Sequence, residues 1–184
     1  MPRVFLGLGS NAGERRLEFL RAAYRQLGAT HGVRIVDASP LYETEPWEGE
    51  PGMGFDQQRW HLNCVVAVET TLAPADLLLQ MQALETALGR QRPPGTPEAR
   101  RAALRTMDID ILLYEDRVMS VPDELHLPHL LLHERAFVLR PLADLAPDLE
   151  HPVLYQTIRE LLEALTDEHG VRPAPFPRRW YEVS

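Results

Sequence analysis

The sequence has little of several features that would restrict where a protein acts. It contains one cysteine, Cys64, so it cannot form an internal disulfide, which fits a reducing cytoplasm. No run approaches the roughly 20 apolar residues that a membrane-spanning helix needs. The first residues run directly into Val4–Gly9, which is too short and too glycine-rich for a signal peptide. We therefore expect a cytoplasmic protein with no membrane partner.

Positive charge is also scarce, and it is unevenly distributed. The net charge of −8 argues against broad nucleic-acid binding, which needs a positive surface, so we expect no nucleic-acid partner. All 19 basic residues are arginines, and five of them lie between residues 90 and 105 against a single acid, Glu98. Such a run is either a solvated loop or a binding site for phosphate groups.

Two aspartates stand one residue apart in an apolar run, "RTMDIDILLY". Because strand side chains alternate between two faces, Asp108 and Asp110 point the same way and lie a few ångströms apart. Two carboxylates held that close repel each other unless one is protonated or a cation lies between them. A strand end in solvent is the alternative, but the isoleucines and leucines on every side favour a cation site.

Apolar periodicity predicts a single domain over residues 1–184. We expect strands at 4–8, 33–38, 62–70 and 108–114, short extended pieces within 118–128, and helices at 11–28, 74–89, 132–147 and 156–165. Asn11 and Glu14 resemble a capping box for the first helix, and residues 40–60 read as a long loop. The core is expected at about 4–165, with an irregular, proline-containing tail at 166–184.

The order β-α-β-β-α-β up to residue 114 indicates an α+β protein. It predicts a ferredoxin-like sheet with helices on one side, plus extra C-terminal strands and helices. "GLGSNA" also satisfies a relaxed dinucleotide-binding fingerprint, with Asp37 at the end of the second strand, so a Rossmann-type NAD(P)-binding protein is an alternative. A nucleotidyltransferase is a weaker match, because about a hundred residues separate Ser10 from Asp108.

Several segments in a particular order carry a more specific resemblance. They are "GLGSN", "YETEPW", "HLNCVVAVET", "LETALGRQR", "RTMDIDILLY", "LPHLLLHERAFVLRPL" and "LAP". In this combination the chain resembles the 6-hydroxymethyl-7,8-dihydropterin pyrophosphokinase family over about residues 4–165. That family is ferredoxin-like and transfers pyrophosphate from ATP to the hydroxymethyl oxygen of the pterin, releasing AMP, in folate biosynthesis.

The resemblance implies a role for each matching residue. Asp108 and Asp110 would bind two Mg²⁺ ions, and Arg90, Arg92 and Arg105 would act with them in catalysis by neutralising phosphate charge. The implied ATP-binding residues are Gln82, Glu85, Arg92, Ile111, His129 and Arg135. The implied pterin-binding residues are Thr44, Glu45, Trp47, Asn63 and Phe137. A solvated helix flank is the alternative for Gln82 and Glu85, and core packing is the alternative for Phe137.

The chain departs from the family pattern at two places. Ala102-Ala103-Leu104 stand where the family usually has a proline-containing run, and His61 stands where the family often has an aromatic residue. A non-catalytic pterin- or nucleotide-binding relative is therefore a second alternative to the enzyme. We expect a monomer, with a dimer as the alternative.

Overall fold

The structure, a computed structural model, describes residues 1–47, 51–52, 54–56, 60–90 and 106–182. Its centre is a six-stranded sheet in which each described pairing is antiparallel. The strands run in the order β5 (Asp108–Tyr114), β1 (Arg3–Ser10), β4 (His61–Thr70), β3 (Tyr42–Thr44) and β8 (Val171–Pro173), and β2 (Val33–Ala38) also pairs with β4. An antiparallel sheet overturns the Rossmann alternative, which requires parallel strands.

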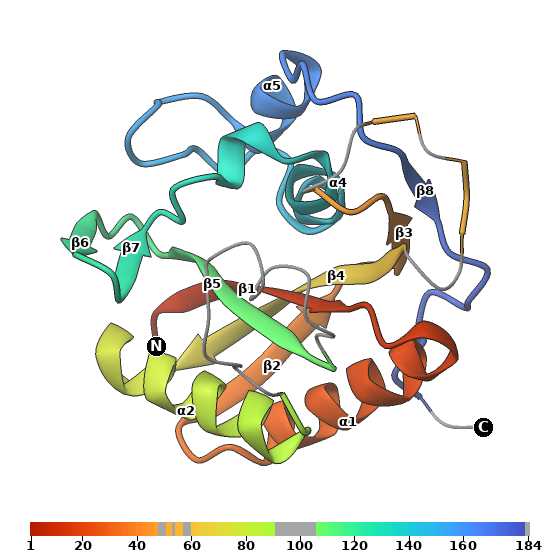
Figure 1. The fold of residues 1–184 in the computed structure, drawn as a ribbon. Helices are drawn as coiled ribbons and strands as arrows, with labels where there is room; N and C mark the ends of the chain where they lie inside the picture. The colour runs from red at the N-terminus through yellow and green to blue at the C-terminus, as the bar shows by residue number, and fades with distance from the viewer. Residues whose placement is uncertain (48–50, 53, 57–59, 91–105, 183–184) are drawn as a thin grey trace.

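Helices cover both faces of this sheet (Figure 1). One face carries α1 (Arg16–Ala29) and α2 (Pro74–Ala87), and the other carries α4 (Ala136–Leu145) with α5 (Ile158–Glu163) beside it. A small hairpin, β6 (Met119–Val121) and β7 (Leu125–Leu127), leads from β5 towards α4. In the part of the chain that the structure describes, no helix is long and apolar enough to cross a bilayer.

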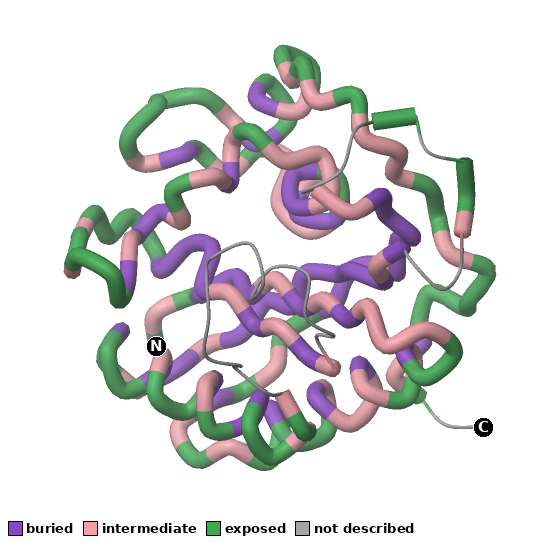
Figure 2. Tube along the Cα trace, viewed as in Figure 1, coloured by how far each residue is buried: buried purple, intermediate pink, exposed green. Residues whose placement is uncertain are grey.

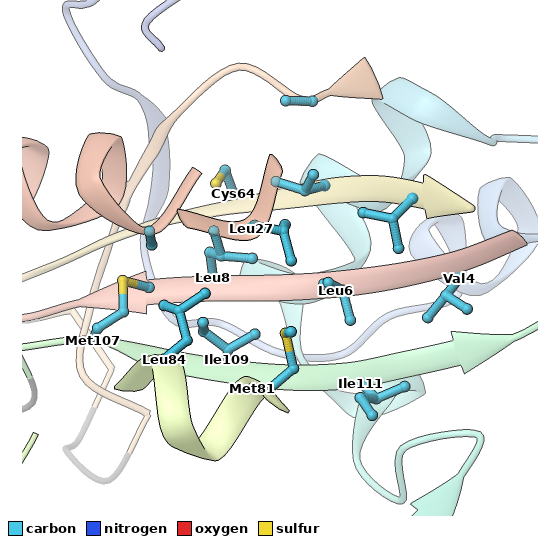
Figure 3. Packing of buried hydrophobic residues seen from close by; sticks show 14 of the residues in the cluster. Val4, Leu6, Leu8, Leu27, Cys64, Met81, Leu84, Met107, Ile109 and Ile111 are labelled. Carbon is cyan, nitrogen blue, oxygen red and sulfur yellow. The ribbon is translucent and has the colours of Figure 1, made fainter. Parts of the chain in front are cut away.

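Two apolar clusters follow from the alternation of strand side chains. Leu6, Leu8, Ile109 and Ile111 point towards α1 and α2, where they pack with residues such as Leu27, Met81 and Leu84 (Figure 3). Phe5, Val65, Leu112 and Leu113 face α4 and α5 instead. β1, β4 and β5 are consequently buried along most of their length, while the outer helix faces are exposed (Figure 2).

An irregularity in β5 makes two consecutive residues face the same side. Phe5 pairs with Leu113 and Leu6 pairs with Ile111, so Leu112 is the extra residue of a bulge. Both Leu112 and Leu113 therefore pack on the α4 side. Before the bulge the alternation is regular, and it directs Ile109 and Ile111 into the core and the aspartates to the opposite face.

Some predicted boundaries are confirmed and others are wrong. The strands at 33–38 and 108–114 and the start of α2 at Pro74 match the structure. The capping box at Asn11 is wrong, because a 3₁₀ turn over Gly13–Arg15 precedes α1 and neither Ala12 nor Arg15 caps its helix with a side chain. The predicted loop over residues 40–60 also contains β3, which pairs with β4. β3 has only three residues, which are too few to show a periodic pattern in the sequence.

The expectation of an irregular tail is wrong for its best-packed part. β8 extends the sheet beyond β3, and the side chain of Trp180 is fully buried in the core. Its Nε1 donates a hydrogen bond to the Ser39 carbonyl at 2.9 Å, and its ring lies edge-on to Tyr24 at 5.6 Å. Pro173, Pro175 and Pro177 interrupt the apolar periodicity of the tail. They do not prevent one large aromatic side chain, Trp180, from anchoring the tail to the core.

Replacement of this anchor tests whether the tail belongs to the folded core. We expect Trp180→Ala to lower the free energy of unfolding by about 3–5 kcal/mol, because it creates a large cavity. Tyr155→Ala is the matched control, since the Tyr155 side chain is 75% exposed. Urea unfolding of the two variants and the wild type measures the difference, and a Trp180→Ala protein as stable as the control would contradict the observed packing.

Candidate active site

A pocket lies on the α4 side of the sheet, where β4, β1 and β5 run side by side. It is lined by Gly7, Leu8, Gly9, Ser10, Asn11, Thr44, Glu45, Trp47, His61, Asn63, Cys64, Val65, Asp108, Asp110, Leu112, Arg135, Phe137 and Val138. Strands β1, β4 and β5 form its floor, the loop after β3 forms one wall, and the beginning of α4 forms another. Five segments of the chain, from β1 to the beginning of α4, thus meet at one place.

The floor is open because β1 carries glycines on this side. A Cβ added at Gly9 would lie 2.3 Å from Oδ1 of Asn63, and one added at Gly7 would contact Leu112 at 3.4 Å. No real Cβ tolerates the first distance, so the Asn63 amide occupies the space that a side chain at position 9 would take. The "GLG" pattern is therefore explained by close packing against β4 rather than by a dinucleotide phosphate.

The predicted acidic pair lies at one end of the pocket, on β5. Asp108 and Asp110 both line it, as the strand alternation predicted. Asp108 Oδ1 accepts a hydrogen bond from the Arg90 guanidinium. The same Arg90 nitrogen donates to Glu85 Oε1 at 2.5 Å, and that oxygen also accepts from the Ile109 backbone N–H at 2.7 Å. Arg90 and Glu85 thus connect the C-terminal end of α2 to the start of β5, and neither residue lines the pocket.

The charges around the pair act on the pKa of Asp110 in both directions. Burial, followed by the charge of Asp108, raises the pKa of Asp110 to about 7, although Arg135 and Arg90 act in the opposite direction. At neutral pH a buried carboxylate with such a pKa requires a proton or an added cation. Among the described residues no group of three or more His, Cys, Asp and Glu side chains forms a metal cage. A pair of carboxylates that leaves positions for phosphate oxygens and water is the arrangement that Mg²⁺ favours, so the residues fit that ion.

The other end of the pocket is amide-lined and aromatic. Asn63 is 7% exposed, and its Nδ2 donates to Thr44 Oγ1 at 2.6 Å. Trp47 and Phe137 meet edge to face with their ring centroids 6.4 Å apart. The Arg135 guanidinium lies 5.3 Å from the first ring and 5.5 Å from the second, within the range of a cation–π contact.

Glu45 is a buried acid at this end of the pocket, and backbone groups bind its carboxylate. Its Oε2 accepts from the Gly170 N–H at 2.6 Å and from the Gly52 N–H at 3.3 Å. Its Oε1 is buried and has no hydrogen-bond partner within the described part of the chain. Glu45 therefore fastens the loop after β3 to the C-terminal segment while it lines the pocket.

Several predicted site residues lie outside the pocket. Gln82 borders a groove on the outer side of α2 together with Arg90. Ile111 is 3% exposed and belongs to the core beneath the sheet. His129 is half-buried next to the pocket, and its backbone N–H donates to the carbonyl of Leu112, which lines it. Arg92 and Arg105, and the altered run 102–104, fall outside the described residues.

The environment of His129 favours its neutral form. Burial, followed by the charge of Arg135, lowers the pKa of His129 to about 4, and the charge of Asp108 opposes the shift. Its Nδ1 accepts a hydrogen bond from the Leu131 N–H at 3.2 Å, so the neutral ring carries its proton on Nε2. At neutral pH His129 thus presents a donor without adding charge.

The comparisons with known proteins identify the family of the chain. The family described as 7,8-dihydro-6-hydroxymethylpterin-pyrophosphokinase (HPPK) matches residues 5–147. The chain belongs to this family. The family resemblance predicted from the sequence motifs is confirmed.

Similar proteins include two bacterial members of the HPPK family. Each is named 2-amino-4-hydroxy-6-hydroxymethyldihydropteridine pyrophosphokinase. The protein of Methylorubrum extorquens is 43% identical over 171 residues, which cover 93% of this chain and 98% of that protein. The protein of Pseudomonas aeruginosa is 42% identical over 152 residues, which cover 83% and 85%.

Longer proteins also contain a region that is similar to this chain. The folic acid synthesis protein fol1 of Schizosaccharomyces pombe is 40% identical over 169 residues, which cover 92% of this chain and 21% of that protein. A crystal structure of Plasmodium falciparum HPPK-DHPS, a triple mutant, superimposes with a TM-score of 0.66 at 18% identity. The superposition covers 88% of this chain and 44% of the Plasmodium chain. Because the identity is low, this similarity supports the fold alone.

The raised pKa of Asp110 gives a stability difference with a definite sign. Between about pH 4 and the folded-state pKa of about 7, the folded protein binds a proton at Asp110 that the unfolded chain has released. Wild-type stability contributed by this group therefore falls as the pH rises through this window. Without metal, we expect the free energy of unfolding of Asp110→Asn to rise relative to that of the wild type across this pH window, by an amount on the order of a few kcal/mol. Above the window the difference should stay constant.

Urea unfolding in the presence of a chelator, from about pH 4.5 to about pH 8, measures this difference. Asp116→Asn is the matched control, because Asp116 is exposed just beyond the same strand. Titrating groups that do not interact with Asp110 contribute equally to the wild type and to Asp110→Asn, so they cancel in the comparison. A stability difference that stays constant with pH would contradict the assignment of the shift to Asp110.

Proposed function

We propose that this pocket is the active site of a pterin pyrophosphokinase. The chain transfers the β,γ-pyrophosphoryl group of ATP to 6-hydroxymethyl-7,8-dihydropterin, giving AMP and the pterin diphosphate in folate biosynthesis. The observation that carries the site assignment is the meeting, in one pocket, of a carboxylate pair and a buried amide with aromatic walls. The acidic end suits a metal-bound polyphosphate, and the amide end suits a flat heterocycle.

The nucleotide is assigned to the acidic end. Asp108 and Asp110 would hold Mg²⁺, two ions by analogy with the family, and the bound metal would neutralise negative charge on the phosphates. Arg90, Arg92 and Arg105 are assigned to the phosphates, because guanidinium groups pair with phosphate oxygens in a bidentate manner. Further contacts to ATP are assigned to Gln82, Glu85, Ile111, His129 and Arg135. For Ile111, whose side chain is in the core, the assignment can hold only through its backbone.

The pterin is assigned to the amide end. After its bond to Thr44, Asn63 retains one N–H and its carbonyl oxygen, which together can pair with the donor–acceptor edge of a pterin. Trp47 and Phe137 supply flat apolar surfaces beside that edge. Glu45 has a buried oxygen without a partner among the described residues, which an N–H of the substrate would satisfy.

The reaction requires mainly positioning and charge stabilisation. The pterin hydroxymethyl oxygen forms a bond to the β-phosphorus, and the bond from that phosphorus to the oxygen shared with the α-phosphate breaks, so AMP leaves. The alcohol proton is released in the same transfer. Holding the two substrates in line converts a bimolecular encounter into a unimolecular step, and cationic side chains stabilise the charge on the phosphoryl oxygens.

Other features of the protein remain part of the proposal. The order β5-β1-β4-β2 with α1 and α2 on one face supports the ferredoxin-like description of the sheet. We propose one domain over residues 1–184, a monomeric state and a cytoplasmic location. A non-catalytic relative that binds the same ligands is the rival function. Release of AMP from ATP that depends on the hydroxymethyl-dihydropterin separates the two, because the rival would bind both ligands without turnover.

Removing one carboxylate tests the metal assignment. We expect Asp108→Asn to abolish Mg²⁺-dependent binding of a non-hydrolysable ATP analogue and to slow AMP release by roughly a thousandfold, because metal clamping contributes several kcal/mol. Titration calorimetry with and without Mg²⁺ measures the first effect. Asp116→Asn should behave as the wild type. A variant that melts earlier but retains its rate when folded would point to a structural role instead.

Filling the floor of the pocket tests the pterin assignment. The methyl group of Gly9→Ala would displace the Asn63 amide from Thr44, so we expect pterin affinity to fall at least about tenfold while the affinity for the ATP analogue changes little. Gly28→Ala is the control, because its added Cβ only contacts Ile35, at 3.4 Å, far from the pocket. Calorimetric titration measures the affinity of each variant for the pterin and for the ATP analogue. An unchanged pterin affinity in Gly9→Ala would rule out Asn63 as the amide that recognises the pterin.

A further inference from the structure

The segment Asp167–Gly170, called here the brace segment, lies after the last helix and contacts both pterin-side walls of the pocket. It touches the first turn of α4, the ring of Trp47 and the carboxylate of Glu45. The sequence alone predicts that it is part of an irregular tail. Three contacts from four consecutive residues are unusual for a loose tail and indicate a specific arrangement.

Asp167 completes the start of α4. Its Oδ2 accepts a hydrogen bond from the Ala136 N–H at 2.8 Å, and the helix has no capping side chain of its own at Arg135. The Asp167 side chain is 2% exposed, so this charge is held in place. A carboxylate at a helix N-terminus satisfies a free N–H and interacts favourably with the helix dipole. The residues on either side of Ala136, Arg135 and Phe137, both line the pocket, as does Val138 of the same helix.

The other oxygen of Asp167 holds a histidine against the aromatic wall. Oδ1 accepts from the His169 backbone N–H at 3.0 Å and lies 2.6 Å from Nδ1 of the His169 ring. That ring is tilted against Trp47 with a centroid distance of 5.1 Å. Because Trp47 also contacts Phe137 and Arg135, the histidine packs against a ring that belongs to the aromatic wall.

Gly170 ties the brace segment to the loop after β3. Its N–H donates to Glu45 Oε2 at 2.6 Å, and its carbonyl accepts from the Glu45 N–H at 2.9 Å. An added Cβ would lie 2.7 Å from the Trp60 ring, so the approach requires glycine. The loop that carries Glu45 and Trp47 is thereby fixed at two points, by Gly170 and by His169.

From these contacts we infer that Asp167 is a positioning residue for the pterin side of the active site. It does not itself belong to the described lining of the pocket. It acts through the first turn of α4 on Phe137 and through His169 on Trp47, so that the two aromatic walls keep a fixed separation. The inference rests on the proposed function, because it is the pterin that these walls are assigned to hold.

Asparagine is an informative replacement because of the pattern of donors around Asp167. Both carboxylate oxygens accept from backbone N–H groups, one from His169 and one from Ala136. An amide has one oxygen, so its NH₂ group must face one of these N–H donors and lose that bond. The size of the side chain is kept, and either the helix start or the histidine is released.

Steady-state AMP release provides the test on the full-length protein, with the melting temperature of each variant measured alongside. Asp167→Asn and His169→Ala are compared with Glu168→Gln, which removes a charge from an exposed side chain of the same segment. We expect both site variants to raise the KM for the pterin about tenfold, the loss of roughly one hydrogen bond, with kcat changed by no more than about twofold. The KM for ATP should rise in Asp167→Asn alone, because Arg135 begins α4 and is assigned to the nucleotide.

The outcomes separate the inference from the function on which it rests. A wild-type protein that releases no AMP with the pterin overturns the proposed function and this inference with it. An active wild type with an unchanged pterin KM in both variants overturns the inference alone. A parallel fall of kcat, both affinities and the melting temperature in His169→Ala also overturns it, since a merely structural role predicts that result. If Asp167→Asn does not fold, His169→Ala still decides.

Discussion

The arrangement of the active site depends on two carboxylates that one strand holds on the same face. Strand geometry leaves Asp108 and Asp110 no freedom to separate, and burial removes the water that would screen them. Among the described residues, Arg90 pairs with Asp108 but also with Glu85, and Arg135 lies farther along the pocket. In the proposed function, a cation held by the two carboxylates would offset their negative charge and accompany a polyphosphate.

A second constraint is the space that the central strand leaves free. β1 lies between the acidic strand and the strand that carries Asn63, so any side chain on its pocket face would separate the two halves of the site. The glycines at positions 7 and 9 keep that face flat, and Asn63 packs directly against the backbone at Gly9. The carboxylates and the amide can therefore serve two substrates held side by side, as an in-line transfer between them requires.

Sequence reasoning succeeded where one local rule decides the outcome. Period-two alternation placed Asp108 and Asp110 opposite Ile109 and Ile111, and proline at the first helical position fixed the start of α2. It failed where long-range contacts decide. The brace segment reaches Ala136 across 31 residues and Glu45 across 125, and no spacing within 166–184 indicates either partner. The capping box failed for a related reason, because the Arg16 guanidinium binds Glu43 and the Trp60 carbonyl and thereby helps to fix where α1 begins.

The contacts of Arg16 also explain why the tail belongs to the site. Arg16 and Arg172 bind the two oxygens of Glu43, and both Arg16 and Glu43 are 4% exposed, so the central carboxylate is neutralised from both sides. A buried charge that loses a partner costs several kcal/mol, so α1, β3 and β8 are held together as one unit. β3 ends at Thr44, immediately before Glu45 and close to Trp47. The charged cluster at the sheet edge therefore sets the position from which the pterin-side loop begins, and the brace segment holds its first residues, Glu45 and Trp47.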